Sequence, residues 1–574
     1  MVRRETVLYA LGPMLRPALA LLPLLAPGLA AAQEEPPAVP PAAEEQAAAP
    51  PTTQEPAAPP PAQEEPKVPP QTEEKPAAPY QASQDQGPMP PKGPVLELTL
   101  EDAMRMALER NLNIELEALN TEIRRFDALG SWGAFDPVLT LSGGLTDAQQ
   151  QGSSGLSGGD ELESDTQFFS GGLLVPFTTG GFLDLSYDRD NTHTNNAFAL
   201  FDTSTTDVLT LALTQPLLRA GWKRYATSLQ REAELEYEKQ VALNEEVRQR
   251  VLRNVSQAYW DLVGAHEELG VRELALETGG QQLEQSRRRL ELEVGTEVDV
   301  LQSETDVAQL EEQRLLAESD LRAAEDVLRA LIFQRTEGEL LEEAQSWDWP
   351  IVTLTPLPEV VPVQPEWLRS LERSLRLRPE LVQQRLEIEA SDVRLDRAKS
   401  NKLPALDLGL SAASAGFDEQ PDEAMRTALG FDFPTYTGSL TFSVPIQNRS
   451  AKYAERSARA ALRASRVVYD QVELVVLAEV RRAVRDLVFA AESVAAAQKS
   501  SEFAERQLAA EQARFREGLS TTFQVLEFQR DRAEALSALT TARAGYAKAA
   551  VALLHAEGRM AGPDDPEAEE PAQQ

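Results

Sequence analysis

The sequence predicts a mostly helical fold with a smaller β part, built as two copies of one structural unit. Three observations support this prediction. Segments separated by an offset of 267 residues match without gaps. Two very long stretches contain no proline and carry apolar residues at helical spacing. Between them lie short runs in which apolar residues alternate with small or polar ones, as in strands that have two different faces.

The composition limits the classes of function. The chain has 574 residues, a formal net charge of −37, no cysteine and three histidines. Strong negative charge argues against general nucleic-acid binding, because phosphate recognition needs clustered cations. Lack of cysteine excludes disulfides, thiolate metal sites and thiol nucleophiles. His193, His266 and His555 have no convincing catalytic partners or metal-ligand spacing, so we predict no enzyme, no metal and no cofactor.

The amino-terminal residues 1–32 have the order of a secretory signal peptide. Arg3 and Arg4 precede an apolar stretch at 18–29, and small residues follow at 30–32. This stretch is too short to span a bilayer comfortably, so we expect export and removal of the segment. No later stretch reaches the roughly eighteen consecutive apolar residues of a membrane-spanning helix.

Two segments of biased composition flank the predicted folded part. Residues 33–94 contain 19 of the 39 prolines, interleaved with Ala, Gln and Glu. Such a segment cannot bury enough apolar surface to offset its conformational entropy, so we predict a disordered tether. Residues 561–574 are short, acidic and proline-containing, and we predict a disordered tail there.

The repeat divides the remaining chain into a first copy at 95–335, a linker at 336–365 and a second copy at 366–560. Each copy has the same order: a helix, alternating strands, a proline-marked strand end, a very long helix, a glycine-containing turn and a returning helix. Matching residues include Pro137 with Pro404 and Leu139 with Leu406.

The predicted helices have related lengths. At 1.5 Å per residue, the stretches 222–292 and 450–516 would each extend about 100 Å. Shorter helices of about 50 Å are predicted at 102–134, 298–334, 366–400 and 522–557. Two short helices together match one long helix, so we expect two of them, stacked end to end, beside each long one. Gly264, Gly270 and the pair Gly279 and Gly280 are candidate bends in the first long helix.

Alternating strands are predicted at 139–142, 209–214, 406–410 and 440–444. Their apolar faces could pack on a soluble core or face lipid in a transmembrane barrel, and the pattern alone does not choose. Four strands are too few to close a barrel, because even small outer-membrane barrels use about eight. Several chains would therefore have to share one.

A further hairpin is predicted only in the first copy, over 168–175 and 182–188. It either lengthens the barrel strands or caps one end. The Gly- and Ser-rich tract 152–159 is predicted to be a flexible loop, because it does not lead from a strand into a helix as a phosphate-binding loop does.

Several motifs together resemble those of the TolC family of outer-membrane channel proteins, over roughly residues 95 to 560. The matching strings are Leu98-Thr99-Leu100-Glu101-Asp102-Ala103, Arg378-Pro379-Glu380-Leu381, Gln215-Pro216-Leu217-Leu218, Val294-Gly295-Thr296 and Asp299-Val300-Leu301. The resemblance implies a homotrimer in which each chain supplies four strands to a twelve-stranded transmembrane β-barrel in outer-membrane lipid. It also implies that the long helices form a periplasmic α-barrel.

The same resemblance implies a function in tripartite efflux or type I secretion. Such a channel is a passive exit duct, docked on a periplasmic membrane-fusion adaptor and an inner-membrane transporter of the RND or ABC class. The sequence does not indicate the cargo.

The resemblance also implies which residues form the sites. Adaptor docking is expected at the two helix-helix turns, Val294, Gly295 and Thr296 in the first copy and Glu517, Gly518 and Leu519 in the second. A carboxylate gate is expected at Asp299, with Gln524 in the matching place of the second copy and Glu527 one turn further on. Repeated around a narrow opening, carboxylates would favour cations. The alternative for Asp299 and Glu527 is a solvated carboxylate at a helix end.

A periplasmic coiled-coil adaptor or scaffold without its own pore is the alternative function. Adaptors usually carry one helical hairpin between β-domains, whereas this chain carries two complete helix-strand-helix copies, which favours the channel.

Overall fold

The computed structural model describes residues 95–151, 161–332, 345–360 and 365–563. The predicted signal peptide 1–32, tether 33–94 and loop 152–159 lie outside the described residues, as do parts of the linker 336–365 and most of the tail 561–574.

Each copy opens with a pair of helices that break at the same place in the repeat. In the first copy these are α1 (Leu100–Arg110) and α2 (Leu112–Ser131), and in the second α7 (Trp367–Leu377) and α8 (Pro379–Asn401). The residue at each break, Asn111 or Arg378, has an extended backbone, and Arg378 precedes a proline, which disfavours helical geometry before it.

The long helices match the predicted stretches closely. They are α4 (Ser228–Glu291), preceded by the short α3 (Lys223–Ala226), and α10 (Arg449–Arg516). The returning helices are α5 (Glu297–Ile332) and α11 (Thr522–Ala556). None of the helices in the described ranges is both long enough and apolar enough to cross a bilayer.

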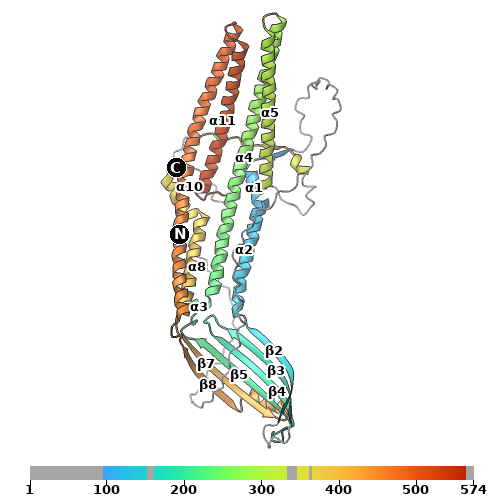
Figure 1. Cartoon of the computed structure of the whole chain (residues 1–574), viewed down its shortest axis with the longest axis vertical. Helices are drawn as coiled ribbons and strands as arrows, with labels where there is room; N and C mark the ends of the chain where they lie inside the picture. Colours follow the sequence, from blue (N-terminus) through green and yellow to red (C-terminus); the bar gives the residue numbers. More distant parts are fainter. Residues whose placement is uncertain (1–94, 152–160, 333–344, 361–364, 564–574) are drawn as a thin grey trace, which may run out of the picture. The chain divides into compact units, whose positions relative to one another are not determined.

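Each long helix lies beside two shorter elements along its length, as predicted. In the half nearer the strands the neighbours follow the order α2, α4, α8, α10, and in the other half the order α5, α4, α11, α10 (Figure 1). The chain therefore forms a layer of four helices in both halves. The helix α4 continues through its four glycines, and Gly279 lets α5 approach closely, because a Cβ there would lie 2.6 Å from Leu310 Cδ1.

A small two-stranded sheet, β1 (Leu96–Leu98) paired in parallel with β6 (Ile351–Thr353), packs on the largest core cluster. The 3₁₀ helix η2 (Gln345–Asp348) precedes β6. Tyr259 of α4 is fully buried, and its hydroxyl donates to the Leu98 carbonyl at 3.1 Å and accepts from the Thr355 amide at 3.0 Å. This sheet joins the chain before the first helix to the inter-copy linker.

The second sheet has six strands in the order β2-β3-β4-β5-β7-β8, and every neighbouring pair is antiparallel. After the 3₁₀ helix η1 (Trp132–Phe135), the first copy contributes β2 (Val138–Gln151), β3 (Glu161–Pro176), β4 (Phe182–Thr194) and β5 (Thr203–Pro216). The second copy contributes β7 (Ala405–Asp418) and β8 (Pro434–Ser443), joined by helix α9 (Pro421–Gly430), which packs on β5 and β7.

The pairing register gives this sheet two chemically different faces. Side chains alternate between the faces along each strand, and directly paired residues share a face. One row across the six strands is apolar: Leu139, Leu173, Leu185, Leu211, Ala412 and Tyr436. The adjacent row on the opposite face is small or polar: Thr140, Gly172, Ser186, Thr210, Ala413 and Thr435.

The sheet corrects the prediction of four strands per chain. The extra hairpin of the first copy forms β3 and β4, which lie within the sheet between β2 and β5. It therefore neither lengthens existing strands nor caps an end, and instead makes the sheet two strands wider. The physical reason is that β3 and β4 continue the alternation of the other strands and pair with them in register.

Candidate functional site

The two turns between long and returning helices have the same length in the structure. The first turn spans 292–296, between the end of α4 and the start of α5, and the second spans 517–521, between α10 and α11. Glu293 and Gly518 occupy equivalent positions, with positive φ values of 58° and 75°. In both turns the next residue donates its amide to the carbonyl of the fifth residue before it, Arg289 or Arg514, which is a common helix C-cap.

The sequence alone suggests matching Gly295 with Gly518, the glycine of each turn, which would make the first turn two residues shorter between its glycine and the next helix. The structure instead matches Gly518 with Glu293, so this alignment of the turns is wrong. The predicted docking residues Val294 and Leu519 are therefore equivalent, and both side chains are highly exposed, at 67% and 70%. The counterparts of Gly295 and Thr296 are Ser520 and Thr521.

The predicted gate position has a structural role in both copies. The Thr296 hydroxyl and amide donate to Asp299 Oδ2 at 2.7 and 3.0 Å, and the Asp299 amide donates back to the Thr296 hydroxyl at 3.2 Å. Thr521 and Gln524 form the same reciprocal capping box at the start of α11. Both pairs satisfy amide groups that a helix start would otherwise leave unpaired.

The surroundings of Asp299 favour the ionised form of its carboxyl group. Hydrogen bonds from Thr296, together with one from Thr522 of the other hairpin and the charge of Arg289, lower the pKa of Asp299 against a smaller opposing effect of burial. The Arg289 guanidinium also lies 4.5 Å from the centre of the Phe515 ring of α10. The two hairpins of one chain therefore meet near their turns.

Glu527 is solvent-exposed in the first turns of α11, and its counterpart in α5 is Gln302. Among the hydrogen bonds of the described residues, none joins Asp299 to Gln524 or Glu527.

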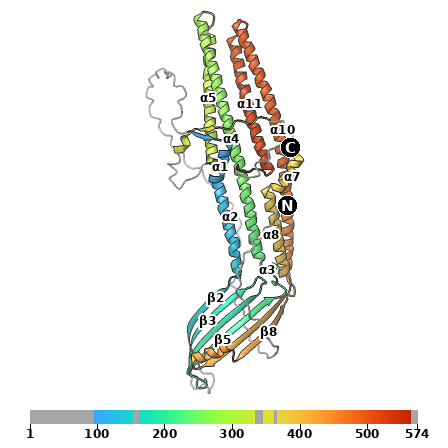
Figure 2. The ribbon, with the colours of Figure 1, turned by 180° about the vertical axis from the view of Figure 1, so that it is seen from behind.

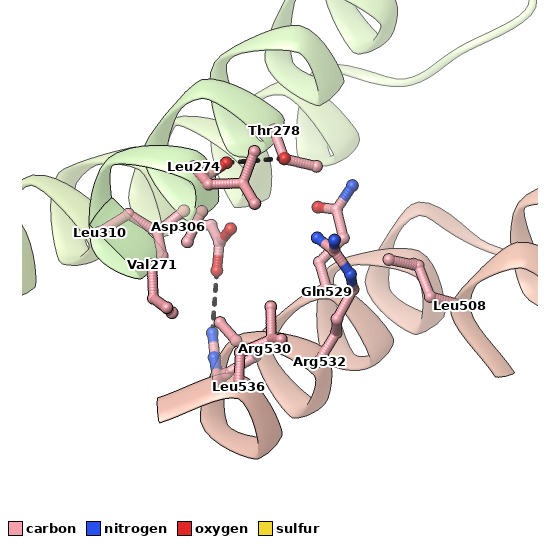
Figure 3. A pocket seen from close by; sticks show the side chains of 12 residues that line it. Val271, Leu274, Thr278, Asp306, Leu310, Leu508, Gln529, Arg530, Arg532 and Leu536 are labelled. Carbon is pink, nitrogen blue, oxygen red and sulfur yellow. Dashed lines mark hydrogen bonds and ion pairs between the residues drawn. The ribbon is translucent and has the colours of Figure 1, made fainter. Parts of the chain in front are cut away.

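A buried ion pair further from the turns links the two hairpins, and the sequence analysis missed it. Asp306 of α5 is almost fully buried, and Arg530 of α11 donates to its Oδ1 at 3.0 Å (Figure 3). The pair borders a small cavity that Leu274, Leu310, Leu508 and other side chains of both hairpins line. Neither residue belongs to a recognisable motif, because the pairing depends on how the two copies pack.

His555 lies at a charged cleft near the far end of α11, about 590 Å³ in volume. Burial, followed by the positive charges of Arg253 and Arg378, lowers the pKa of His555 from 6.5 to about 4, against an opposing effect of Glu380. His266 and His193 contact the Leu262 carbonyl and the Thr203 hydroxyl. In the described part of the chain, no three His, Asp or Glu side chains are placed to hold a metal ion.

We expect the stability of the folded chain to fall as the pH drops from about 6.5 to 4. Over this range the unfolded chain binds a proton at His555 that the folded chain does not, because the folded-state pKa is lowered. The loss amounts to a few kcal/mol at most. His555→Gln should flatten this part of the pH dependence, measured as unfolding temperature at pH 7 and pH 4.5. An identical drop in both proteins would contradict the assignment.

The helical layer and the two-faced antiparallel sheet form a fold that solved outer-membrane channels share. The chain belongs to the outer membrane efflux protein family, whose model matches residues 182–332 and 370–559, more than half of its length. The predicted resemblance to the TolC family is thereby confirmed. This is a family of transport channels and not of enzymes.

Individual relatives agree with the family. The proteases secretion protein PrtF of Dickeya chrysanthemi is 25% identical over 280 residues, which cover 47% of this chain and 56% of that protein. The chain thus matches little more than half the length of this relative. Among solved structures, the outer-membrane channel OprN has a TM-score of 0.58 at 17% identity, covering 80% of this chain and 89% of its own.

The Campylobacter jejuni outer-membrane channel CmeC gives the same TM-score of 0.58 at 15% identity, covering 82% of this chain and 87% of its own. At such identities the likeness to OprN and CmeC shows the fold.

Proposed function

We propose that this chain is one subunit of a homotrimeric exit duct. Its sheet joins a shared transmembrane barrel, and its helices join a tunnel in the periplasm. A periplasmic adaptor and an inner-membrane transporter of the RND or ABC class would deliver cargo to it, for efflux or for type I secretion. The name of the relative PrtF describes protease secretion, which supports type I secretion as the function of this chain.

The observation that carries the proposal is that the chain has two unpartnered sides. Within the described sheet, β2 and β8 have a neighbour on one side only. Figure 1 and Figure 2 both place β2 next to the end of α2, and β8 next to the start of α10. Each side therefore consists of a free strand edge and the outermost helix of the layer.

Each outermost helix also presents a row of residues at spacings of three and four, typical of a helix that packs on a partner. On α2 the row is large and apolar, and each member is more than half exposed: Leu112, Leu116, Leu119, Ile123 and Phe126. On α10 the row contains mostly smaller side chains and is also exposed: Tyr453, Ser457, Ala460, Ala464 and Val467. Counted from the sheet, the middle members Ile123, Leu119 and Leu116 lie level with the smaller Ser457, Ala460 and Ala464, whereas Phe126 lies level with Tyr453 and Leu112 with Val467.

The two sides differ and complement each other, which is the geometry that closes identical subunits into a ring. The number three is what the family resemblance implies. The test is the mass of the protein extracted in detergent from the outer-membrane fraction, with bound detergent subtracted. A three-chain particle is expected. A water-soluble monomer would place the sheet in a soluble domain and overturn the proposal.

The exposed Val294 and Leu519 are proposed to contact the adaptor. We expect Val294→Asp combined with Leu519→Asp to reduce adaptor binding at least tenfold, since each change places a charge in an apolar contact. Trimer mass should stay the same, because both side chains are exposed at the turns. The control is Leu368→Asp, at an exposed leucine of α7. Unchanged adaptor binding in the double variant, measured on immobilised trimer, would remove the turns from the docking site.

The carboxylates Asp299 and Glu527 are proposed to set cation preference at the entrance. Asp299→Gln removes charge but keeps a capping group, because Gln524 caps the second copy in the same way. Combined with Glu527→Gln, it should lower cation selectivity in single-channel recordings without loss of folding. Asp299→Ala removes both the charge and the helix cap, so it should also lower the unfolding temperature. Comparing it with Asp299→Gln separates the effect of the charge from the effect of the cap. An unchanged reversal potential in the double Gln variant would exclude a gating role.

A further inference from the structure

The β3–β4 hairpin is fully integrated into the sheet. Register runs without interruption from Val138 opposite Leu174 to Gln151 opposite Glu161, and β4 pairs in the same way with β3 and β5. The hairpin turns near the helices, since a Cβ at Gly181 would contact Gln215 at the end of β5. It therefore extends along the other strands over their length.

The hairpin also has the same two faces as its neighbours. Near its turn, four of its apolar residues are on the face of Leu139 and Leu211, and most of its polar residues are on the face of Thr140 and Thr210. Phe168, Leu174 and Phe182 are exceptions on the polar face, and Gln167 and Arg189 are exceptions on the apolar face. The apolar members are Leu173, Val175, Leu183 and Leu185, and the polar members are Ser170, Asp184, Ser186 and Asp188. A hairpin that plugged a lumen or covered an end would have no reason to continue a lipid-type face.

Six is an even number, so copies of the sheet can close into one barrel. In an all-antiparallel sheet of six strands the outer two, β2 and β8, run in opposite directions. The β8 edge of one copy can therefore pair antiparallel with the β2 edge of the next, and no edge stays open.

The widths of the two layers support this closure. Four helices at an interaxial distance of 8–10 Å occupy roughly 36 Å. Strands about 4.8 Å apart and tilted by about 40° each occupy roughly 6 Å of circumference, so six strands occupy about 38 Å and four about 25 Å. Six strands per copy thus match the helical layer to which they connect, whatever the number of copies.

We infer that every copy gives six adjacent strands to the barrel wall, so that a trimer has an eighteen-stranded barrel instead of the twelve strands that the family resemblance implies. The inference rests on the proposed shared barrel. Barrel diameter grows about linearly with strand number, so the exit is about half again as wide. Barrels of sixteen to eighteen strands leave an aqueous channel.

The first test uses cysteine pairs, for which the chain is well suited because it has no native cysteine. Thr441→Cys in β8 is combined with single cysteines at successive positions 139–144 of β2. Disulfide-linked oligomers are expected with polar-face partners such as Thr140→Cys and Ser142→Cys, and not with the intervening Leu141→Cys. The control pair Ser186→Cys with Thr210→Cys, paired within one chain, should form no linked oligomer.

A second intrachain pair locates the hairpin in the assembled particle. Thr140→Cys with Gly172→Cys links β2 to β3 only if the hairpin lies beside β2 in the wall. Efficient closure is expected in the membrane-extracted trimer. Failure of this pair, while the Ser186 and Thr210 pair closes, would overturn the inference.

Electron cryomicroscopy of the native trimer decides the strand number directly, with eighteen strands expected. A trimer with twelve strands would overturn the inference and leave the proposed function intact. A particle with another number of copies would overturn the proposed trimer. In such a particle, six barrel strands per copy would still support the inference, and four would overturn it.

Discussion

Replacing Leu119 and Ile123 together by Asp is expected to dissociate the trimer into single chains. Both residues lie in the exposed row of α2, on the side of the helix away from α4. In the proposed ring each carboxylate would be desolvated against the α10 row of the next copy, at a cost of several kcal/mol per contact. Since about 1.4 kcal/mol is a tenfold change in affinity, the dissociation constant should rise by at least a thousandfold.

The matched control adds the same charge elsewhere on α2. Ala118 and Asn113 are exposed but lie outside the row, so Ala118→Asp with Asn113→Asp should leave the trimer intact. Native mass and chemical cross-linking measure the outcome. If the control dissociates as much as the row variant, repulsion between the added charges explains the effect and the row is not the interface.

The sequence predicts the helical architecture well because helix signals are long and repeated. The Pro-free stretch that becomes α10 is predicted to within a residue at each end. The stacked short helices follow from matching lengths, and the breaks at Asn111 and Arg378 are separated by the offset of the predicted repeat. The sequence analysis misses the three-residue strands β1 and β6. A run of three residues is too short to show an alternating pattern, and the two strands are separated in sequence by most of the first copy.

The sequence is less informative about the sheet and the turns. Alternation in β3 and β4 reveals a hairpin, but only the register shows that it lies inside the sheet. At the turns, glycine is the expected residue for a positive φ, which leads to matching Gly295 with Gly518. The structure places Glu293 in that conformation instead. The ion pair between Asp306 and Arg530 joins the two repeats of one chain, so no local sequence pattern predicts it.

Replacing Tyr259 by Ala is expected to destabilise the middle of the helical layer by about 3–5 kcal/mol, the usual cost of truncating a buried aromatic side chain. Tyr259 is fully buried, and its ring packs edge-on against Trp260 at 5.5 Å. Its hydroxyl also joins β1 to the segment after β6. The variant should unfold at a lower temperature, as measured by loss of helical circular dichroism.

Tyr259→Phe separates packing from hydrogen bonding. It keeps the ring but leaves the Leu98 carbonyl and the Thr355 amide without their shared partner, at a cost of about 1–3 kcal/mol. Hydrogen exchange should therefore accelerate at Thr355 while α4 stays protected. Tyr237→Phe, on the same helix at a half-buried position, is the control. If exchange at Thr355 is the same in Tyr259→Phe and the wild type, the hydroxyl does not hold this segment, and the stability of the region comes from apolar packing alone.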